Sequence, residues 1–180
     1  MADSCVLVAL GSNLGDPRQT VEAAMLQLER RLGGACWRAS SLWHSRPLDC
    51  PPDSPDFVNA VIAAAVPGTP EWASPRGLLA MLQALERDFG RARTRVRNAP
   101  RPLDLDLLLF ADVQCNDVDC VLPHPRALER RFVLEPAAEV APDLVWPGTG
   151  QSVRSLCEAL RAAPGQTDVQ RMTATSRTSD

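Results

Sequence analysis

Residues 101–110 read Arg-Pro-Leu-Asp-Leu-Asp-Leu-Leu-Leu-Phe, the most informative segment of the chain. Its apolar residues predict a buried strand from Leu103 to Phe110. Side chains two positions apart on a strand share one face, so Asp104 and Asp106 point the same way, with about 6.5–7 Å between them along the strand. The leucines that alternate with them face the core. The stretch therefore predicts a strand with a carboxylate pair on one face and an apolar surface on the other.

Further elements precede this strand in a regular order. The pairs Asp16-Pro17 and Ser74-Pro75 each indicate the start of a helix. The predicted elements are strands over 5–10, 37–48, 57–66 and 103–110 and helices over 17–32 and 75–89. The order β-α-β-β-α-β is the split pattern of ferredoxin-like folds. The predicted fold class is therefore α+β, with a ferredoxin-like βαββαβ core.

The part of the chain after the last of these strands adds to this core. Short elements are expected over 111–163, with a last helix near 153–160. From Pro164 onward the residues are polar and small, which is typical of a disordered tail. We therefore predict one domain over residues 1–163, a length that buries a core without disulfides, and a disordered tail over 164–180.

Composition and charge exclude several classes of function. The 180 residues carry a formal net charge of −3, whereas a protein that holds nucleic acid through its overall field is normally basic. All 19 basic residues are Arg, which excludes a Walker-type phosphate loop and Schiff-base chemistry, because both need a Lys amine. The sequence has no basic leader and no apolar run of about 20 residues. We expect a cytoplasmic protein with no membrane partner.

The cysteines indicate a reducing compartment. The six are Cys5, Cys36, Cys50, Cys115, Cys120 and Cys157. None forms a C-x-x-C pair, so a zinc knuckle is not indicated. Several lie in apolar runs, which is typical of buried free thiols in a reducing compartment.

The carboxylate pair follows a cluster of guanidinium groups. Five arginines fall within eleven residues: Arg91, Arg93, Arg95, Arg97 and Arg101. Guanidinium groups bind phosphate bidentately, and Mg²⁺ binds through one or two carboxylates plus substrate phosphates. Taken separately, the carboxylates also fit a solvated sheet face, and the arginines fit a solvated basic run or an RNA-binding patch. Their adjacency favours a nucleotide whose phosphates are shared by Mg²⁺ and Arg.

Three further motifs are weaker when taken alone. Residues 11–15, Gly-Ser-Asn-Leu-Gly, lie between a strand and a helix, where backbone N–H groups meet ligands, although a tight turn explains them equally well. Phe57 and Asn59 share one face of their strand and offer an aromatic surface and an amide to a flat heterocycle. A core Phe and a turn Asn are the simpler interpretation. His124 is either a phosphate contact or a structural residue.

Together and in this order, the motifs resemble the 6-hydroxymethyl-7,8-dihydropterin pyrophosphokinase family of folate biosynthesis, over about residues 5–160. The matching segments are Ala-Leu-Gly-Ser-Asn-Leu-Gly at 9–15, Ser-Ser-Leu-Trp at 40–43, Phe-Val-Asn-Ala at 57–60, Arg-Asn-Ala-Pro-Arg-Pro-Leu-Asp-Leu-Asp at 97–106 and Leu-Pro-His-Pro at 122–125. The resemblance implies an ATP- and Mg²⁺-dependent diphosphotransferase. Diphosphate would pass from ATP to the hydroxymethyl group of the pterin, with release of AMP.

The resemblance also implies a role for each matching residue. Asp104 and Asp106 correspond to catalytic ligands of two Mg²⁺ ions, and Arg91 and Arg101 to catalytic arginines. The implied ATP-binding residues are Gln83, Glu86, Arg91, Arg93, Arg97, Arg101, Leu107, His124 and Arg130. The implied pterin-binding residues are Gly11, Ser45, Arg46, Leu48, Phe57, Asn59 and Phe132, with the two phenylalanines sandwiching the ring.

Four positions depart from the family's pattern. Asn98 stands where some members carry a loop Trp, and Pro125 where some carry an aromatic residue. Asp119 stands where an Arg can occur, and Arg46 replaces a small residue or Pro. These departures bear on closure over the nucleotide and on individual ligand contacts.

Two other classes of function remain open. RRM domains share the split β-α-β order, so an RNA-binding module is one alternative, although acidic residues on the fourth strand would repel phosphates without a metal. A metal-dependent nucleotidyltransferase, which releases pyrophosphate instead of AMP, is the other. The preferred interpretation is a monomeric enzyme that binds ATP and 6-hydroxymethyl-7,8-dihydropterin and no nucleic acid.

Overall fold

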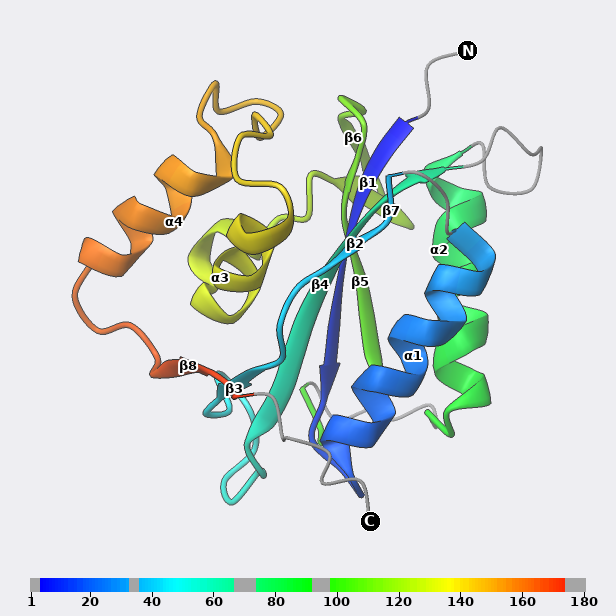
Figure 1. Ribbon diagram of the computed structural model, residues 1–180, viewed down its shortest axis with the longest axis vertical. Helices are drawn as coiled ribbons and strands as arrows, with labels where there is room; N and C mark the ends of the chain where they lie inside the picture. The colour runs from blue at the N-terminus through cyan, green and yellow to red at the C-terminus, as the bar shows by residue number, and fades with distance from the viewer. Residues whose placement is uncertain (1–3, 33–35, 67–73, 92–97, 174–180) are drawn as a thin grey trace.

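An antiparallel β-sheet runs through the middle of the protein, with helices on both sides of it (Figure 1). The computed structural model describes residues 4–32, 36–66, 74–91 and 98–173. The strands of this sheet are β1 (Ser4–Ser12), β2 (Arg38–Ala39), β3 (Trp43–Ser45), β4 (Phe57–Val66), β5 (Asp104–Phe110) and β8 (Val169–Arg171). Their order is β5-β1-β4-β3-β8, and β2 pairs with β4. The predicted α+β class is confirmed.

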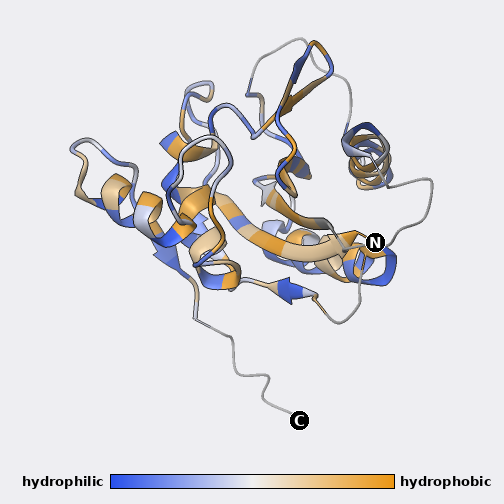
Figure 2. Ribbon diagram, turned by 90° about the horizontal axis from the view of Figure 1, so that it is seen from above, coloured by the Kyte–Doolittle hydropathy of each residue, from blue (hydrophilic) through white to orange (hydrophobic). Residues whose placement is uncertain are grey.

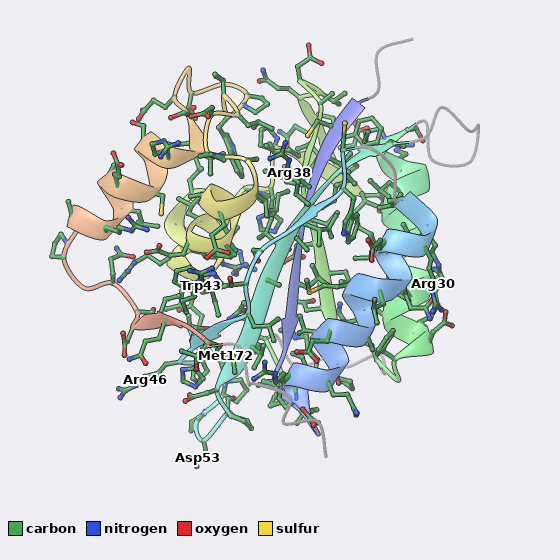
Figure 3. All side chains as sticks on the ribbon, in the orientation of Figure 1. Arg30, Arg38, Trp43, Arg46, Asp53 and Met172 are labelled. Atoms are coloured by element: carbon green, nitrogen blue, oxygen red, sulfur yellow. The ribbon has the colours of Figure 1, made fainter. Side chains whose placement is uncertain are left out.

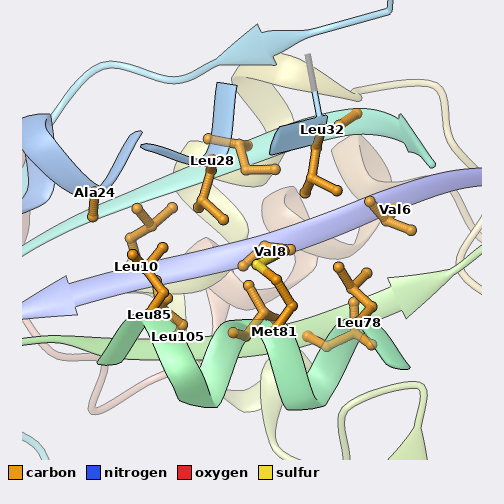
Figure 4. Packing of buried hydrophobic residues seen from close by; sticks show 14 of the residues in the cluster. Val6, Val8, Leu10, Ala24, Leu28, Leu32, Leu78, Met81, Leu85 and Leu105 are labelled. Atoms are coloured by element: carbon orange, nitrogen blue, oxygen red, sulfur yellow. The ribbon is translucent and has the colours of Figure 1, made fainter. Parts of the chain in front are cut away.

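Helices α1 (Pro17–Leu32) and α2 (Pro75–Asp88) cover one face of the sheet (Figure 4). Asp16 and Ser74 cap their first turns by accepting backbone N–H hydrogen bonds at 3.0 and 3.2 Å, as the sequence predicts. The side chains buried between these helices and the sheet include Val6, Val8, Leu10, Ala24, Leu28, Leu78, Leu85 and Leu105. Each buried leucine contributes about 1.5–3 kcal/mol, so this layer holds β1 and β5 firmly in place.

The other face carries α3 (Arg131–Val140) and α4 (Val153–Ala162), with the short 3-10 helix η1 (Ala127–Glu129) before them. The sequence predicts α4. It does not predict α3, because Pro136 lies inside this helix, where proline removes a backbone hydrogen bond. Apolar residues line the central strands and polar residues the outer faces of the helices (Figure 2). Within the described ranges, none of the helices combines the length and the apolar character needed to cross a membrane.

Strand β5 contains a bulge directly after its carboxylates. Val8 pairs with Leu107 and Leu7 pairs with Leu109, so Leu108 is an extra residue. Leu108 and Leu109 therefore both pack in the cluster beneath α3 and α4. The residues before the bulge keep the regular alternation on which the site depends.

A small hairpin follows β5 and packs beside α2. Its strands are β6 (Cys115–Asp117) and β7 (Cys120–Leu122). Cys120 is buried in the cluster beneath α1 and α2. Arg76 of α2 forms an ion pair with Asp117 at 2.8 Å. The hairpin is thereby held against both the core and α2.

The structure corrects three predictions. The strand predicted over 37–48 is two short strands, β2 and β3, because the pairing with β4 shifts by one residue between Ala39 and Trp43. Cys5 and Cys36 are exposed instead of buried, since Cys5 lies near the start of β1 and Cys36 lies in a turn. The C-terminal tail also differs from the prediction.

The tail predicted over 164–180 is ordered in part. Residues Val169–Arg171 form β8, which pairs with β3, and Val169 is buried there. Met172 packs against the core, and Arg171 forms an ion pair with Glu139 at 3.0 Å. Val169 and Met172 are the apolar residues that attach this segment to the core. They lie in a polar stretch, so composition alone did not predict β8. Residues 174–180 lie outside the described part of the chain.

Candidate active site

The carboxylate pair of β5 lies on the sheet face opposite α1 and α2, where one row of residues crosses four strands. Asp104 pairs with Gly11, Gly11 with Asn59, and Asn59 with Trp43. A Cβ atom added to Gly11 would lie 3.5 Å from Asn59 Oδ1 and 3.8 Å from Phe57 Cδ1. The glycine therefore leaves open space between the carboxylate and the amide.

Two cavities meet at the carboxylate pair. The first, of about 170 Å³, lies over β1, β3 and β4 beneath α3. The second, of about 720 Å³, lies between α2 and the β6–β7 hairpin. The residues that line both cavities are Arg91, Asp104, Asp106 and His124. Two molecules bound in the two cavities would therefore approach each other at these four side chains.

Two arginines hold Asp104. Arg91 Nη1 lies 2.8 Å from Asp104 Oδ1, and Arg101 Nη1 lies 3.0 Å from Asp104 Oδ2. Arg91 also pairs with Glu86, whose Oε1 accepts a hydrogen bond from Leu105 N at 2.8 Å. Burial raises the pKa of Glu86, while the bonds from Leu105 and Arg91 oppose that shift. The buried Glu86 thus orients Arg91 toward Asp104.

Asp106 has a different electrostatic environment. Desolvation by the surrounding protein, followed by the negative charge of Asp104, raises the pKa of Asp106 to about 6, although its side chain stays partly accessible. His124 Nε2 lies 3.9 Å from Asp106 Oδ2. Burial, followed by the positive charges of Arg130 and Arg126, lowers the pKa of His124 to about 4. A neutral imidazole does not compensate the carboxylate at neutral pH, so Asp106 is the group that a bound cation would stabilise most.

The donor set suits Mg²⁺ better than a fully protein-ligated metal. Among the residues that the structure describes, no group of three or more His, Cys, Asp or Glu side chains is placed to hold a metal. The side chains of Asp104 and Asp106 remain 25% and 36% exposed, so their oxygens are accessible to a ligand. Structural zinc takes four protein ligands, whereas Mg²⁺ keeps waters and takes substrate phosphate oxygens beside one or two carboxylates.

The floor of the first cavity presents a fixed amide. Asn59 Nδ2 donates to Ser45 Oγ at 2.9 Å and to Trp43 O at 3.3 Å, and Asn59 is buried. Both bonds use the nitrogen, which leaves Oδ1 over Gly11 as an acceptor. Phe57, two residues earlier on β4, adds an aromatic surface to the same cavity. The combination suits a flat molecule with a donor on its edge.

The model of the 7,8-dihydro-6-hydroxymethylpterin-pyrophosphokinase family matches residues 7–142, which contain every part of this site. The chain belongs to this family. A pyrophosphokinase of this name from Pseudomonas aeruginosa is 42% identical over 159 residues, which are 88% of this chain and 91% of that protein. One from Synechocystis sp. is 37% identical over 152 residues, which are 84% of this chain and 74% of that protein.

Solved structures support the fold of this family member. The wild-type HPPK-DHPS protein of Plasmodium falciparum superimposes with a TM-score of 0.65 at 11% identity. The match covers 87% of this chain and 41% of that longer chain. At this identity the likeness shows the fold alone.

The structure divides the predicted binding residues between the two cavities. All seven predicted pterin-binding residues line the first cavity: Gly11, Ser45, Arg46, Leu48, Phe57, Asn59 and Phe132. Among the predicted ATP-binding residues, Gln83, Glu86 and Leu107 line the second cavity, and Arg91 and His124 line both. Arg101 and Arg130 line the first cavity, beside the carboxylates. Arg93 and Arg97 lie outside the described residues.

The four departures from the family's pattern lie around these cavities. Asn98 Nδ2 donates to Asp49 O at 2.7 Å, which joins the segment before β5 to the segment before β4. Asp119 and Pro125 line the second cavity. Arg46 is exposed at the rim of the first cavity and extends away from the sheet (Figure 3).

Asn13 is a site residue whose individual role the sequence does not predict. Asn13 Oδ1 accepts from Arg101 N at 2.8 Å, and Asn13 Nδ2 donates to Pro55 O at 3.1 Å. The backbone N–H of Asn13 donates to Arg101 O at 3.3 Å. These hydrogen bonds therefore hold in place the backbone of Arg101 and the segment before β4.

Arg126 and Cys50 also line the first cavity. Of these two residues, only Arg126, which follows the Leu-Pro-His-Pro motif, lies in a segment that the sequence indicates as functional.

Asn13→Ala is expected to lower kcat by about threefold to tenfold, because Arg101 loses the bond that places its backbone beside the carboxylates. The free energy of unfolding should fall by about 1–3 kcal/mol, as for a buried group left without its partner. Asn13→Asp keeps the acceptor for Arg101 N and should retain most of kcat. Steady-state kinetics and urea unfolding of both variants test this. Equal kcat losses in the two variants would contradict a role through Arg101.

Proposed function

We propose that the chain transfers diphosphate from ATP to the hydroxymethyl group of 6-hydroxymethyl-7,8-dihydropterin, giving the pterin diphosphate and AMP in folate biosynthesis. The observation that carries this is the meeting of two cavities at Asp104 and Asp106. One cavity has the size and lining for a heterocycle, and the other is an open groove beside α2. Family membership supports the same reaction.

The pterin binds in the first cavity, with its ring between Phe57 and Phe132. Asn59 Oδ1 accepts a hydrogen bond from the ring edge, while Ser45 and the Trp43 carbonyl fix the amide. Arg130 lies over the Phe132 ring, with 5.5 Å between its guanidinium carbon and the ring centroid, and it orients that aromatic wall. The hydroxymethyl group then points along β1 toward the carboxylates.

ATP binds in the second cavity, and its triphosphate reaches the carboxylates. Gln83 and Leu107 line the groove, and the neutral imidazole of His124 lies at its inner end. Asp104 and Asp106 would hold two Mg²⁺ ions. Bound Mg²⁺ would supply charge neutralisation of the triphosphate and a lower pKa for the attacking hydroxyl.

The arginines stabilise the charge that develops on the transferred group. Arg91 and Arg101 contact Asp104 from two directions, so both guanidinium groups lie where the two substrates meet. The hydroxyl attacks the β-phosphorus in line, and these groups bind the phosphate oxygens without becoming deprotonated. Arg93 and Arg97 contribute further phosphate contacts.

The proposal also covers the fold and the domain organisation. We infer a ferredoxin-like core, and the strand order β5-β1-β4-β3 supports it when β2 and β3 are taken as one split second strand. Residues 1–163 form the single pyrophosphokinase domain, which β8 extends by one edge strand. We also propose that the protein acts as a monomer.

Product analysis tests the proposed reaction. Incubation with ATP, Mg²⁺ and 6-hydroxymethyl-7,8-dihydropterin should give AMP and pterin diphosphate in equal amounts, as measured by anion-exchange chromatography. Omitting the pterin should abolish AMP release. Release of pyrophosphate with a nucleotidylated product would contradict the proposal and indicate a nucleotidyltransferase.

Asn59→Ala is expected to weaken pterin binding by about 1–3 kcal/mol, because the ring edge loses its buried partner. Affinity for a non-hydrolysable ATP analogue with Mg²⁺ should stay unchanged, since Asn59 lines only the first cavity. Isothermal titration calorimetry with each ligand measures both effects. Comparable losses for the two ligands would show that Asn59 acts on the fold and not on the pterin.

A further inference from the structure

Two thiols face each other in the β6–β7 hairpin. Cys115 Sγ and Cys120 Sγ lie 3.1 Å apart, and Cys115 Sγ is also 3.1 Å from the carbonyl oxygen of Cys120. A disulfide needs a sulfur–sulfur distance of about 2.05 Å, so the two atoms must approach by roughly 1 Å. Side-chain rotation on neighbouring strands of one short hairpin can supply a movement of this size.

The two thiols differ in accessibility. Cys115 is partly exposed, whereas Cys120 is buried in the core cluster. Burial, followed by the hydrogen bond with Cys115, raises the pKa of Cys120 to about 11. An oxidant from solvent therefore meets Cys115 first, and Cys120 is the neighbour that resolves the product.

The hairpin is also a wall of the second cavity. Residues 118–122 line this cavity opposite Gln83 and Glu86 of α2. The ion pair between Arg76 and Asp117 anchors the hairpin to the same helix. A covalent bond that draws Cys120 toward Cys115 therefore moves the wall on which the proposed nucleotide site depends.

We propose that Cys115 and Cys120 form a reversible disulfide when the protein meets a peroxide, and that this bond weakens nucleotide binding in the second cavity. The thiol of Cys115 attacks hydrogen peroxide and becomes a sulfenic acid, with release of one water. Cys120 Sγ then attacks the sulfenic sulfur, which forms the S–S bond and releases a second water. Both sulfur atoms are oxidised and the peroxide is reduced to water; a dithiol then reduces the disulfide back to two thiols and is itself oxidised to a disulfide.

The chemical half of this proposal does not depend on the proposed function, because mass spectrometry reads it directly. Trypsin cleaves after Arg97 and Arg126 but not between Arg101 and Pro102, so one peptide, 98–126, carries both thiols and no other cysteine. After treatment with one equivalent of peroxide and alkylation with iodoacetamide, this peptide should be unalkylated and lighter by two hydrogen atoms. Dithiothreitol before alkylation should restore two modified thiols.

The effect of the disulfide on nucleotide binding rests on the proposed function and is measured as the KM for ATP. We expect oxidation to raise this KM by about fivefold or more, the range of ordinary coupling between sites, and dithiothreitol to reverse it. Cys115→Ser should have the KM of the reduced wild type and show no response to peroxide. Cys36→Ser, which removes an exposed thiol elsewhere, should respond like the wild type.

Two results would overturn the proposal. Alkylation of both thiols in peptide 98–126 after peroxide treatment would show that the disulfide does not form. A complete disulfide with an unchanged KM for ATP would show that the hairpin is not coupled to the nucleotide. If the protein had no pyrophosphokinase activity at all, the peptide mass would still show whether the disulfide forms.

Discussion

Asp106→Asn is expected to lower kcat by about 100-fold or more while leaving the protein folded. Asp106 lies where the two cavities meet, and the carboxylate is proposed to hold Mg²⁺ against the transferred phosphates. An amide of the same shape retains the oxygen but not the charge. Losing one electrostatic contact to a transition state typically lowers kcat by about 10²–10³. Steady-state kinetics over a range of Mg²⁺ concentrations measures the loss.

The free energy of unfolding distinguishes a loss of metal binding from a loss of folding. Because the folded state raises the pKa of Asp106 from 3.8 to about 6, the stability of the metal-free protein falls as the pH rises between these two values and stays lower above them. The neutral amide removes this penalty, so the free energy of unfolding at pH 7 should be unchanged or higher. Asp104→Asn should instead lower it, because Arg91 and Arg101 lose their shared partner. Near wild-type activity of Asp106→Asn at limiting Mg²⁺ would refute the metal assignment.

Arg101→Ala is expected to lower kcat by at least about tenfold, with a smaller change in KM. Arg101 is held in place before any substrate binds. Its Nη1 contacts Asp104, its Nε donates to Ala99 O at 3.1 Å, and its backbone N–H donates to Asn13. A guanidinium positioned in this way needs little rearrangement to bind the charge of the transition state.

Two further variants decide whether the position or the charge of Arg101 matters. Arg101→Lys should recover activity only in part, because an ammonium cannot form the bidentate contact of a guanidinium. Arg154→Ala, which removes an exposed arginine paired with Asp143, is the matched control and should leave kcat unchanged. Full recovery by Lys would show that a diffuse positive field suffices.

Local signals in the sequence predict much of the fold. Phe57–Val66 forms a strand with the bounds that its apolar run predicts, and Asp16 and Ser74 begin helices as their capping chemistry requires. What local signals miss is decided by distant contacts. Helix α3 tolerates Pro136 because it packs on the sheet, and β8 forms because β3 offers it a free edge.

In the candidate site, too, some features are predicted from the sequence and others depend on distant contacts. Strand periodicity places Asp104 and Asp106 on one face, and the family resemblance supplies the residues of both cavities. Neither indicates that Asn13 braces Arg101, because 88 positions separate the two residues and the contact depends on the pairing of β1 with β5. The proximity of Cys115 and Cys120 likewise depends on the register of the β6–β7 hairpin.

A crystal structure with Mg²⁺, a non-hydrolysable ATP analogue and 6-hydroxymethylpterin would show how the two cavities are occupied. We expect the pterin ring on Phe57 with its edge at Asn59, and the nucleotide between α2 and the hairpin. Mg²⁺ should lie about 2.0–2.1 Å from oxygens of Asp104 and Asp106 and of the phosphates. A nucleotide base in the first cavity, or Mg²⁺ without contact to Asp106, would contradict this expectation.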